Sequence, residues 1–139
     1  MPQWARLHPA MRGRLQSPAD ERERPTILVV EDEQIVALDL EQTLHEIGYH
    51  VVGVTDNGSD AIALADEHKP KLVLMDVLLR GKMSGIDAAS RISRSGETPV
   101  IFLTANSDRD TVSRAAEVAP YGFIIKPFNL KELTAAIEI

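Results

Sequence analysis

Short runs of apolar residues alternate in this chain with longer stretches in which apolar residues recur every three or four positions. The runs have the length of buried β-strands, and the stretches have the period of amphipathic helices. Strands that are apolar throughout are typical of parallel sheets covered by helices on both faces. The five predicted strands are Thr26–Val30, His50–Thr55, Leu72–Asp76, Val100–Thr104 and Gly122–Ile125.

Each predicted strand is followed by a predicted helix with one apolar face. Pro120 is expected to end the fourth helix, and Asn129 to cap the last one, with Glu132 three residues later as in a capping box. The residues predicted to face the sheet are Val36, Leu40, Leu44 and Ile47 in the first helix, Ala61, Leu64, Ala65 and His68 in the second, Ile86, Ala89 and Ile92 in the third, Val112, Ala115, Ala116 and Ala119 in the fourth, and Leu130, Leu133 and Ile137 in the last.

Five alternations of strand and helix over residues 26–139 predict one α/β domain. Right-handed crossovers between parallel strands produce a doubly wound sheet with helices on both sides, a three-layer sandwich. The first and third strands both end in acids, so we place them side by side. This gives the strand order 2-1-3-4-5, which is adopted from flavodoxin-like folds.

Composition narrows the function classes. With 44% apolar and 26% charged residues, the chain has the composition of a soluble globular protein, and its apolar runs are too short to span a bilayer. The net charge of −6, without a basic stripe, argues against nucleic-acid binding. The absence of cysteine excludes disulfides and thiolate metal sites and fits a cytoplasmic location.

The two ends of the chain differ from the rest. Residues 1–25 hold four of the eight prolines and five arginines without sustained apolar periodicity. We interpret them as a flexible leader, or as residues added to the natural chain. The sequence stops at Ile139 inside a helical pattern, so we expect either a cut from a longer polypeptide or a frayed last turn.

Polar residues stand at the ends of four predicted strands. Glu31 and Asp32 follow the first strand, Asp76 ends the third, Thr104 ends the fourth and Lys126 follows the fifth. The carboxyl ends of parallel strands line the ligand crevice of such sheets. Three carboxylates there would repel one another unless a cation lay among them, and oxygen ligands of this kind suit Mg²⁺. The alternative is a cluster of solvated acids.

A carboxylate beside a metal can attack phosphorus and form an aspartyl phosphate. Mg²⁺, the ammonium of Lys126 and the hydroxyl of Thr104 would neutralise and hold the phosphoryl oxygens. We choose Asp76 as the nucleophile because it stands alone, whereas Glu31 and Asp32 are neighbours suited to holding the metal.

Five short motifs resemble the receiver domain of two-component response regulators, the family of the chemotaxis regulator CheY. They are ILVVEDE at 27–33, LMD at 74–76, MSG at 83–85, FLTA at 102–105 and GFIIKPF at 122–128. The resemblance implies a signalling domain, not an enzyme, with Asp76 accepting a phosphoryl group from a histidine kinase or a histidine phosphotransfer protein. Lys126 would pair with the phosphoryl oxygens, and the backbone at Ala105 and Leu78 would contact them.

The resemblance also implies a metal set and a switch. Asp32, Asp76 and the backbone carbonyl of Leu78 would bind Mg²⁺, with Glu31 acting directly or through water. On phosphorylation the Thr104 hydroxyl would move toward the phosphate and the Phe123 ring would turn inward.

The same family implies a partner and a backbone feature. A downstream effector would read the switch, and homodimers would form through the fourth helix, the fifth strand and the last helix. The Lys126–Pro127 bond would be cis.

Three positions depart from the family pattern. Gly85 lies nine positions after Asp76, one more than usual, and Arg80 stands where a proline is common. We interpret Arg80 and Lys82 as solvated loop residues; the alternative is that they steer an acidic partner. Phe123 replaces the frequent tyrosine, so the switch must work by packing.

The sequence fits three other functions less well than it fits phosphoryl transfer to Asp76. A haloacid-dehalogenase-type phosphatase would need a second acid at Leu78. A nucleotide-binding domain would need a glycine-rich loop after the first strand, where acids stand instead. The remaining alternative is a receiver that docks or dimerises without phosphorylation, although such modules usually lose an acid, the phosphoacceptor or the lysine.

Overall fold

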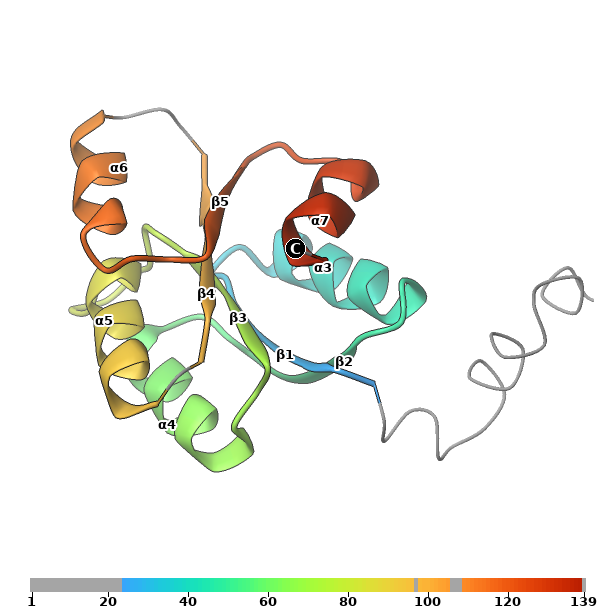
Figure 1. Cartoon of the computed structure of the whole chain (residues 1–139), viewed down its shortest axis with the longest axis horizontal. Helices are drawn as coiled ribbons and strands as arrows, with labels where there is room; N and C mark the ends of the chain where they lie inside the picture. The colour runs from blue at the N-terminus through green and yellow to red at the C-terminus, as the bar shows by residue number, and fades with distance from the viewer. Residues whose placement is uncertain (1–23, 97, 106–108, 139) are drawn as a thin grey trace, which may run out of the picture.

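A computed structural model describes residues 24–96, 98–105 and 109–138 of the chain. The expectations for the leader at 1–23 and for Ile139 lie outside the described residues. Strands and helices alternate as predicted (Figure 1). The elements are β1 (Thr26–Val30), α3 (Gln34–Glu46), β2 (His50–Thr55), α4 (Gly58–His68), β3 (Leu72–Asp76), α5 (Gly85–Ser95), β4 (Val100–Thr104), α6 (Arg109–Ala116), β5 (Gly122–Ile125) and α7 (Leu130–Ile137).

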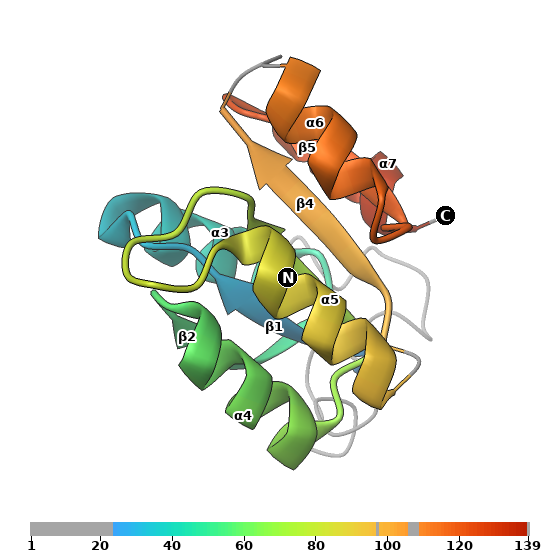
Figure 2. The same cartoon turned by 90° about the vertical axis from the view of Figure 1, so that its left-hand side faces the viewer.

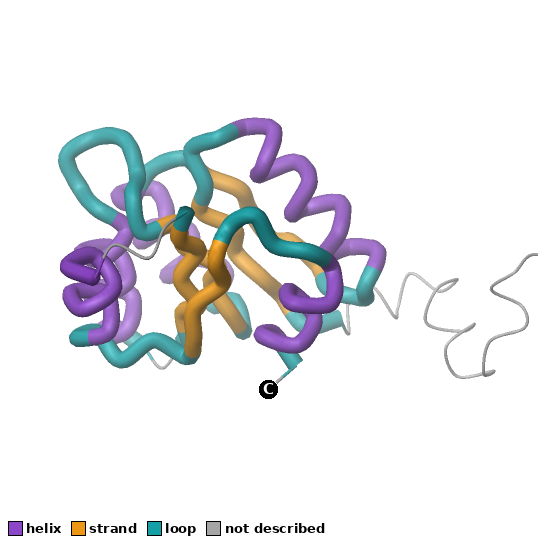
Figure 3. Tube along the Cα trace, turned by 90° about the horizontal axis from the view of Figure 1, so that it is seen from above, coloured by secondary structure: helices purple, strands orange, loops and turns teal. Residues whose placement is uncertain are grey.

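The five strands form one sheet in the order β2-β1-β3-β4-β5, and every pair is parallel. The predicted fold and strand order are therefore confirmed. Helices α4, α5 and α6 cover one face of the sheet (Figure 2), and α3 and α7 cover the other, which makes three layers (Figures 1 and 3). Among the described residues, no helix is long and apolar enough to cross a bilayer.

Alternate residues of the central strands point into two separate cores, as the period of two in a strand requires. The core beneath α4, α5 and α6 contains Leu28, Val30, Val73, Met75 and Phe102. The core beneath α3 and α7 contains Ile27, Val29, Leu74, Ile101 and Leu103. Because β3 and β4 are buried along their whole length, their carboxyl ends are held firmly in place.

The predicted inner faces are largely correct, with exceptions at three helices. In α4, Ala61 and Ala65 are buried but His68 is exposed, because it lies in the last turn. Leu130 is 53% exposed, since it is the first residue of α7. Asn129 caps α7 as predicted and accepts a hydrogen bond from the Glu132 N–H at 2.8 Å.

The fourth helix ends earlier than predicted. Helix α6 ends at Ala116, and Ala116 and Ala119 are exposed, so Pro120 does not end the helix. The N–H groups of Glu117, Val118 and Ala119 bond to carbonyls three residues back, which tightens the chain into a turn. Ala119 then takes a φ of +54°. The helical pattern of the sequence therefore continues past the point at which the helix ends.

Gly85 lies against the end of β3. A Cβ atom at this position would lie 1.8 Å from the backbone carbonyl oxygen of Asp76, while the Gly85 N–H donates to the Val77 carbonyl at 3.1 Å. A glycine is required because backbone atoms cannot yield as a flexible side chain can. This contact fixes the start of α5 beside Asp76.

We predict that Gly85→Ala lowers the free energy of unfolding by about 2 kcal/mol or more, because the added methyl group displaces the end of β3. Gly96→Ala is the matched control, since its backbone is extended and its nearest neighbour, the Thr98 hydroxyl, would lie 3.9 Å away. Urea unfolding followed by circular dichroism measures both. Equal stability of the two variants would contradict the steric argument.

Candidate functional site

Three acids meet where the neighbouring strands β1 and β3 end. Glu31 and Asp32 directly follow β1, and Asp76 is the last residue of β3. One carboxylate oxygen from each residue lies within 4.8 Å of the other two, and no other group of three or more potential metal ligands in the described part of the chain meets this condition. Glu31 and Asp76 are buried, and Asp32 is partly buried. The structure therefore brings the predicted acids together.

Lys126 supplies a cation to two of these acids. Its Nζ donates to Asp76 Oδ2 at 3.0 Å and also to Glu31 Oε1. The Lys126 N–H donates to the Thr104 carbonyl at 2.8 Å, which fixes the backbone just beyond β5. The following Lys126–Pro127 bond is cis, as the resemblance implied. Three segments distant in sequence thus form one ion cluster.

The cluster changes the acidity of two of its members. Burial and a hydrogen bond with Asp76 raise the pKa of Glu31 to about 7, although the nearby Lys126 acts in the opposite direction. Burial by itself lowers the pKa of Lys126, but hydrogen bonds and charge attraction from Glu31 and Asp76 outweigh it and leave that pKa above its ordinary value. Lys126 therefore stays charged at neutral pH, whereas the pKa of Glu31 is raised toward neutral pH.

Backbone groups hold the remaining carboxylate oxygens. The Leu78 N–H donates to Asp76 Oδ1 at 3.0 Å, and the Glu33 N–H donates to Glu31 Oε2 at 3.2 Å. The Leu78 side chain is 69% exposed and takes no part in the core. Leu78 thus approaches the site through its backbone, while its side chain points to solvent.

The three other predicted residues lie on β4 and β5. Thr104 ends β4, the strand between β3 and β5, and is buried beside the acid cluster. Ala105 is exposed at the start of the next loop. Phe123 is half-buried on β5, and its ring centroid lies 5.8 Å from that of Phe102. Thr104 is therefore near the acids, while Phe123 belongs to the packing of the sheet.

The sequence interpretation missed a contact between Arg80 and the acid cluster. Arg80 Nε lies 3.5 Å from Asp32 Oδ2, although 83% of the arginine side chain is exposed. The arginine is solvated, as expected, but it also contacts the acid cluster. Its unusual place in the loop, four positions after Asp76, is the signal that could have pointed to this contact.

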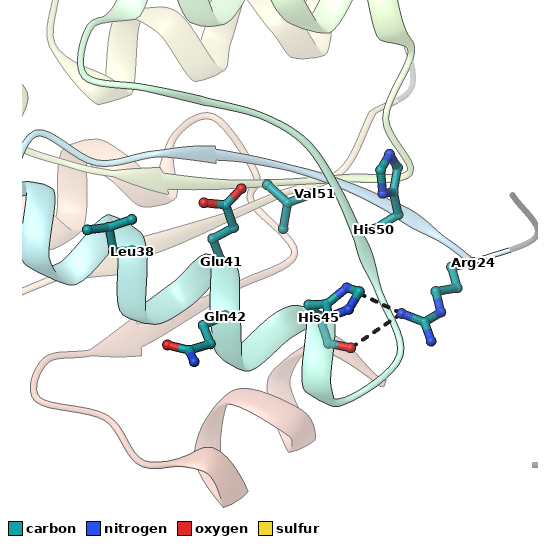
Figure 4. Close-up of a pocket in the computed structure, with 7 residues that line it drawn as sticks. All are labelled: Arg24, Leu38, Glu41, Gln42, His45, His50 and Val51. Carbon is teal, nitrogen blue, oxygen red and sulfur yellow. Dashed lines mark hydrogen bonds between the residues drawn. The ribbon is translucent and has the colours of Figure 1, made fainter. Parts of the chain in front are cut away.

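A separate surface groove lies at the other end of the strands, near the amino ends of β1 and β2 (Figure 4). It runs between α3 and β2 and is lined by Leu38, Glu41, His45 and His50, with Arg24 at its end. Arg24 Nη1 lies 3.4 Å from His45 Nδ1 and 3.5 Å from the His45 carbonyl. These residues lack the cluster of like charges found at the acid site.

The acid cluster can bind a hard divalent cation. Three carboxylates at the ends of two adjacent strands offer the hard oxygen ligands that Mg²⁺ prefers. A carboxylate that also bonds an ammonium can accept a phosphoryl group while that ammonium balances the added charge.

Comparison with known proteins places this chain in a family. The response regulator receiver domain family matches residues 27–138. The transcriptional regulatory protein PdtaR of Mycobacterium tuberculosis is 42% identical over 113 residues, which are 81% of this chain and 55% of that protein. The phyllosphere-induced regulator PhyR of Methylorubrum extorquens is 38% identical over 81% of this chain and 42% of its own length. The chain thus spans about half the length of these relatives.

Solved structures agree with the sequence comparison. The signal receiver domain of a modulated diguanylate cyclase from Desulfovibrio desulfuricans G20 superimposes with a TM-score of 0.79 and 36% identity, over 83% of this chain and 91% of that one. Receiver domains are signalling domains that bind Mg²⁺ at an acidic pocket and interact with histidine kinases and effector domains. This chain belongs to the response regulator receiver domain family of two-component signal transduction.

Proposed function

We propose that Asp76 is the phosphoacceptor and takes its phosphoryl group from a histidine kinase or a histidine phosphotransfer protein. The observation that carries this proposal is the bridge that Lys126 makes between Asp76 and Glu31 in a cluster of three acids. A chain that only docks or dimerises has no need of a buried ammonium beside an aspartate. Family membership supports the same assignment.

The transfer follows from the charges around Asp76. A carboxylate oxygen of Asp76 attacks phosphorus, the phosphorus–nitrogen bond of the donor phosphohistidine breaks, and the imidazole leaves. The ammonium of Lys126, 3.0 Å from Asp76 Oδ2, offsets the charge of the phosphoryl oxygens. The N–H of Ala105 and the hydroxyl of Thr104 donate to the same oxygens, and the Leu78 backbone lies beside them.

The metal set in this proposal is Asp32, Asp76 and the backbone carbonyl of Leu78, with Glu31 acting directly or through water. When bound there, Mg²⁺ supplies positive charge that stabilises the transferring phosphoryl group. The cluster supports this assignment because its three carboxylates lie close together and are only partly balanced by Lys126.

Thr104 and Phe123 form the proposed switch. Thr104 lies on the strand next to Asp76, so a short shift of its hydroxyl toward the phosphate leaves space behind it. Phe123, half-buried against Phe102, then turns inward. Because Phe123 has no hydroxyl, the change reaches the surface through packing alone.

The altered face is that of α6, β5 and α7, through which we propose that the phosphorylated chain dimerises or contacts an effector. Tyr121, Ile125 and Leu130 are 72%, 57% and 53% exposed on or beside β5 and α7. The name of PdtaR, a transcriptional regulatory protein, suggests an output in gene regulation. A cytoplasmic location fits a chain that contains no cysteine.

We predict that acetyl phosphate with Mg²⁺ adds one phosphoryl group, about 80 Da, to the chain, because Asp76 is the proposed nucleophile and the Lys126 ammonium, 3.0 Å from its Oδ2, offsets the added charge. Intact-mass analysis measures the adduct. Asp76→Asn should show none, and Asp87→Asn, an exposed acid in the first turn of α5, serves as the control that keeps it. An adduct that survives Asp76→Asn would retire the proposal.

We predict that Mg²⁺ affinity rises with pH. The Glu31 pKa of about 7 lies above its ordinary value, so the metal-free site holds a proton below pH 7 that binding must displace. Between pH 6 and pH 8 the affinity should rise about tenfold. Isothermal titration calorimetry measures it, and Glu31→Gln should flatten the pH dependence. An equal rise in that variant would assign the proton to another group.

We predict that beryllofluoride with Mg²⁺, a mimic of the phosphoryl group, shifts the chain toward dimers in light scattering. Ile125→Glu should prevent the shift, because it places a charge within the proposed apolar contact. Ile35→Glu is the control, since Ile35 is 83% exposed on α3, which covers the opposite edge of the sheet. Dimers that form equally well with Ile125→Glu would exclude this face.

A further inference from the structure

We propose that Arg80 is a counter-ion of Asp32 that must leave before Asp32 can bind Mg²⁺, so that this arginine sets the metal affinity of the site. The inference deepens the proposed function and rests on it, because it concerns the same metal set. It starts from one contact, in which Arg80 Nε lies 3.5 Å from Asp32 Oδ2.

The three acids of the cluster do not share the same cation. Lys126 bonds Glu31 and Asp76, and its side chain is 13% exposed. Among the described residues, the only ion pair of Asp32 is with Arg80, and it lies on the open side of the site. The Asp32 side chain is 12% exposed, whereas the Arg80 side chain is 83% exposed. The arginine therefore meets the carboxylate from the solvent side.

The charges show why the two cations compete. When all three carboxylates are ionised they carry a formal charge of −3, and Lys126 reduces it to −2, which one divalent ion neutralises. With Arg80 still in contact, the metal-loaded site would carry +1. A third cation near a divalent ion is repelled at short range. Arg80 thus reduces the formal charge of the metal-free site from −2 to −1 and opposes the loaded one.

The loop that carries Arg80 allows its side chain to move away from Asp32. It lies between Asp76 and Gly85 and projects from the carboxyl end of the sheet (yellow-green in Figure 2). Arg80 is 83% exposed, and the next residue, Gly81, has a φ of +99°, so the backbone turns directly after the arginine. A long, mostly solvated side chain can move from Asp32 to water without breaking the core.

The matched control lies in the same loop. Lys82 is exposed, carries the same charge and lines the same surface hollow as Arg80, but no ion pair joins it to an acid among the described residues. Loss of Lys82 therefore changes the charge of the loop without removing a contact at Asp32. Arg80→Gln keeps a polar side chain while it removes the charge, and Arg80→Lys keeps the charge but loses the guanidinium.

The experiment titrates Mg²⁺ into the whole chain at pH 8 and fixed ionic strength and follows amide signals by NMR. Arg80→Gln should bind Mg²⁺ about threefold more tightly than the unmodified chain, in line with the strength of an exposed ion pair. Arg80→Lys should lie between the two, and Lys82→Gln should change the affinity by less than half as much as Arg80→Gln does. Raising the salt concentration should reduce the effect of Arg80→Gln.

The Arg80 Nε–H signal provides a test that needs no metal. In the metal-free chain it should shift when Asp32 is changed to Asn, and it should shift similarly when Mg²⁺ is added to the unmodified chain. A signal that ignores Asp32→Asn, an unchanged or weaker affinity in Arg80→Gln, or an equal gain in Lys82→Gln would each overturn the inference. These results would leave the phosphoacceptor proposal intact, whereas an absence of Mg²⁺ binding in every chain would overturn both.

Discussion

The structure depends on keeping three carboxylates within 4.8 Å of one another beside a single buried ammonium. A buried charge without a partner costs several kcal/mol, so the acids and Lys126 must be brought together by the fold. The acids end β1 and β3, whereas Lys126 follows β5, and β4 lies between them. The lysine side chain therefore reaches across the end of β4, where Thr104 lies. This requirement links four strands at one edge of the sheet.

The fold meets this requirement by separating rigid parts from adjustable ones. Strands β3 and β4 are buried along their full length, and Gly85 holds α5 against the carbonyl of Asp76, so the backbone of Asp76 cannot move far. Other contacts of the site come from the loop after β3, through the backbone N–H of Leu78 and the exposed side chain of Arg80. A signalling site needs both kinds of support, because its reacting groups must stay in place while the surrounding loops change conformation.

A partner can detect a conformational change of the domain only at the domain's surface. Apolar side chains are exposed at both edges of the sheet, with Ile35 and Leu38 on α3 beside β2, and Tyr121 and Ile125 at β5. The relatives PdtaR and PhyR are roughly twice as long as the matched region, so in those proteins further sequence is joined to such a domain. Asp76 ends the central strand β3, two strands from either edge, and the β5 edge is the one that carries Phe123, which packs against Phe102 of β4.

The sequence by itself determined the element order, the two-sided burial of the central strands and the candidate residues at the strand ends. These features are local: a run of four or five apolar residues followed by an acid can be read without knowing what lies opposite. It also determined the cap of α7, because Asn129 and Glu132 are three residues apart. The inner face of α6 was only partly predictable, since the apolar pattern continues past Ala116, where the backbone tightens into a turn.

Only the tertiary structure decided which charges meet. Lys126 is 50 residues from Asp76 and 95 from Glu31, and its choice of both partners depends on the strand order, which was adopted from related folds. The raised pKa of Glu31 results from burial that no local pattern reveals. The contact between Arg80 and Asp32 depends on the path of an eight-residue loop between Asp76 and Gly85, and loop paths follow from packing and turn geometry instead of hydrophobic period.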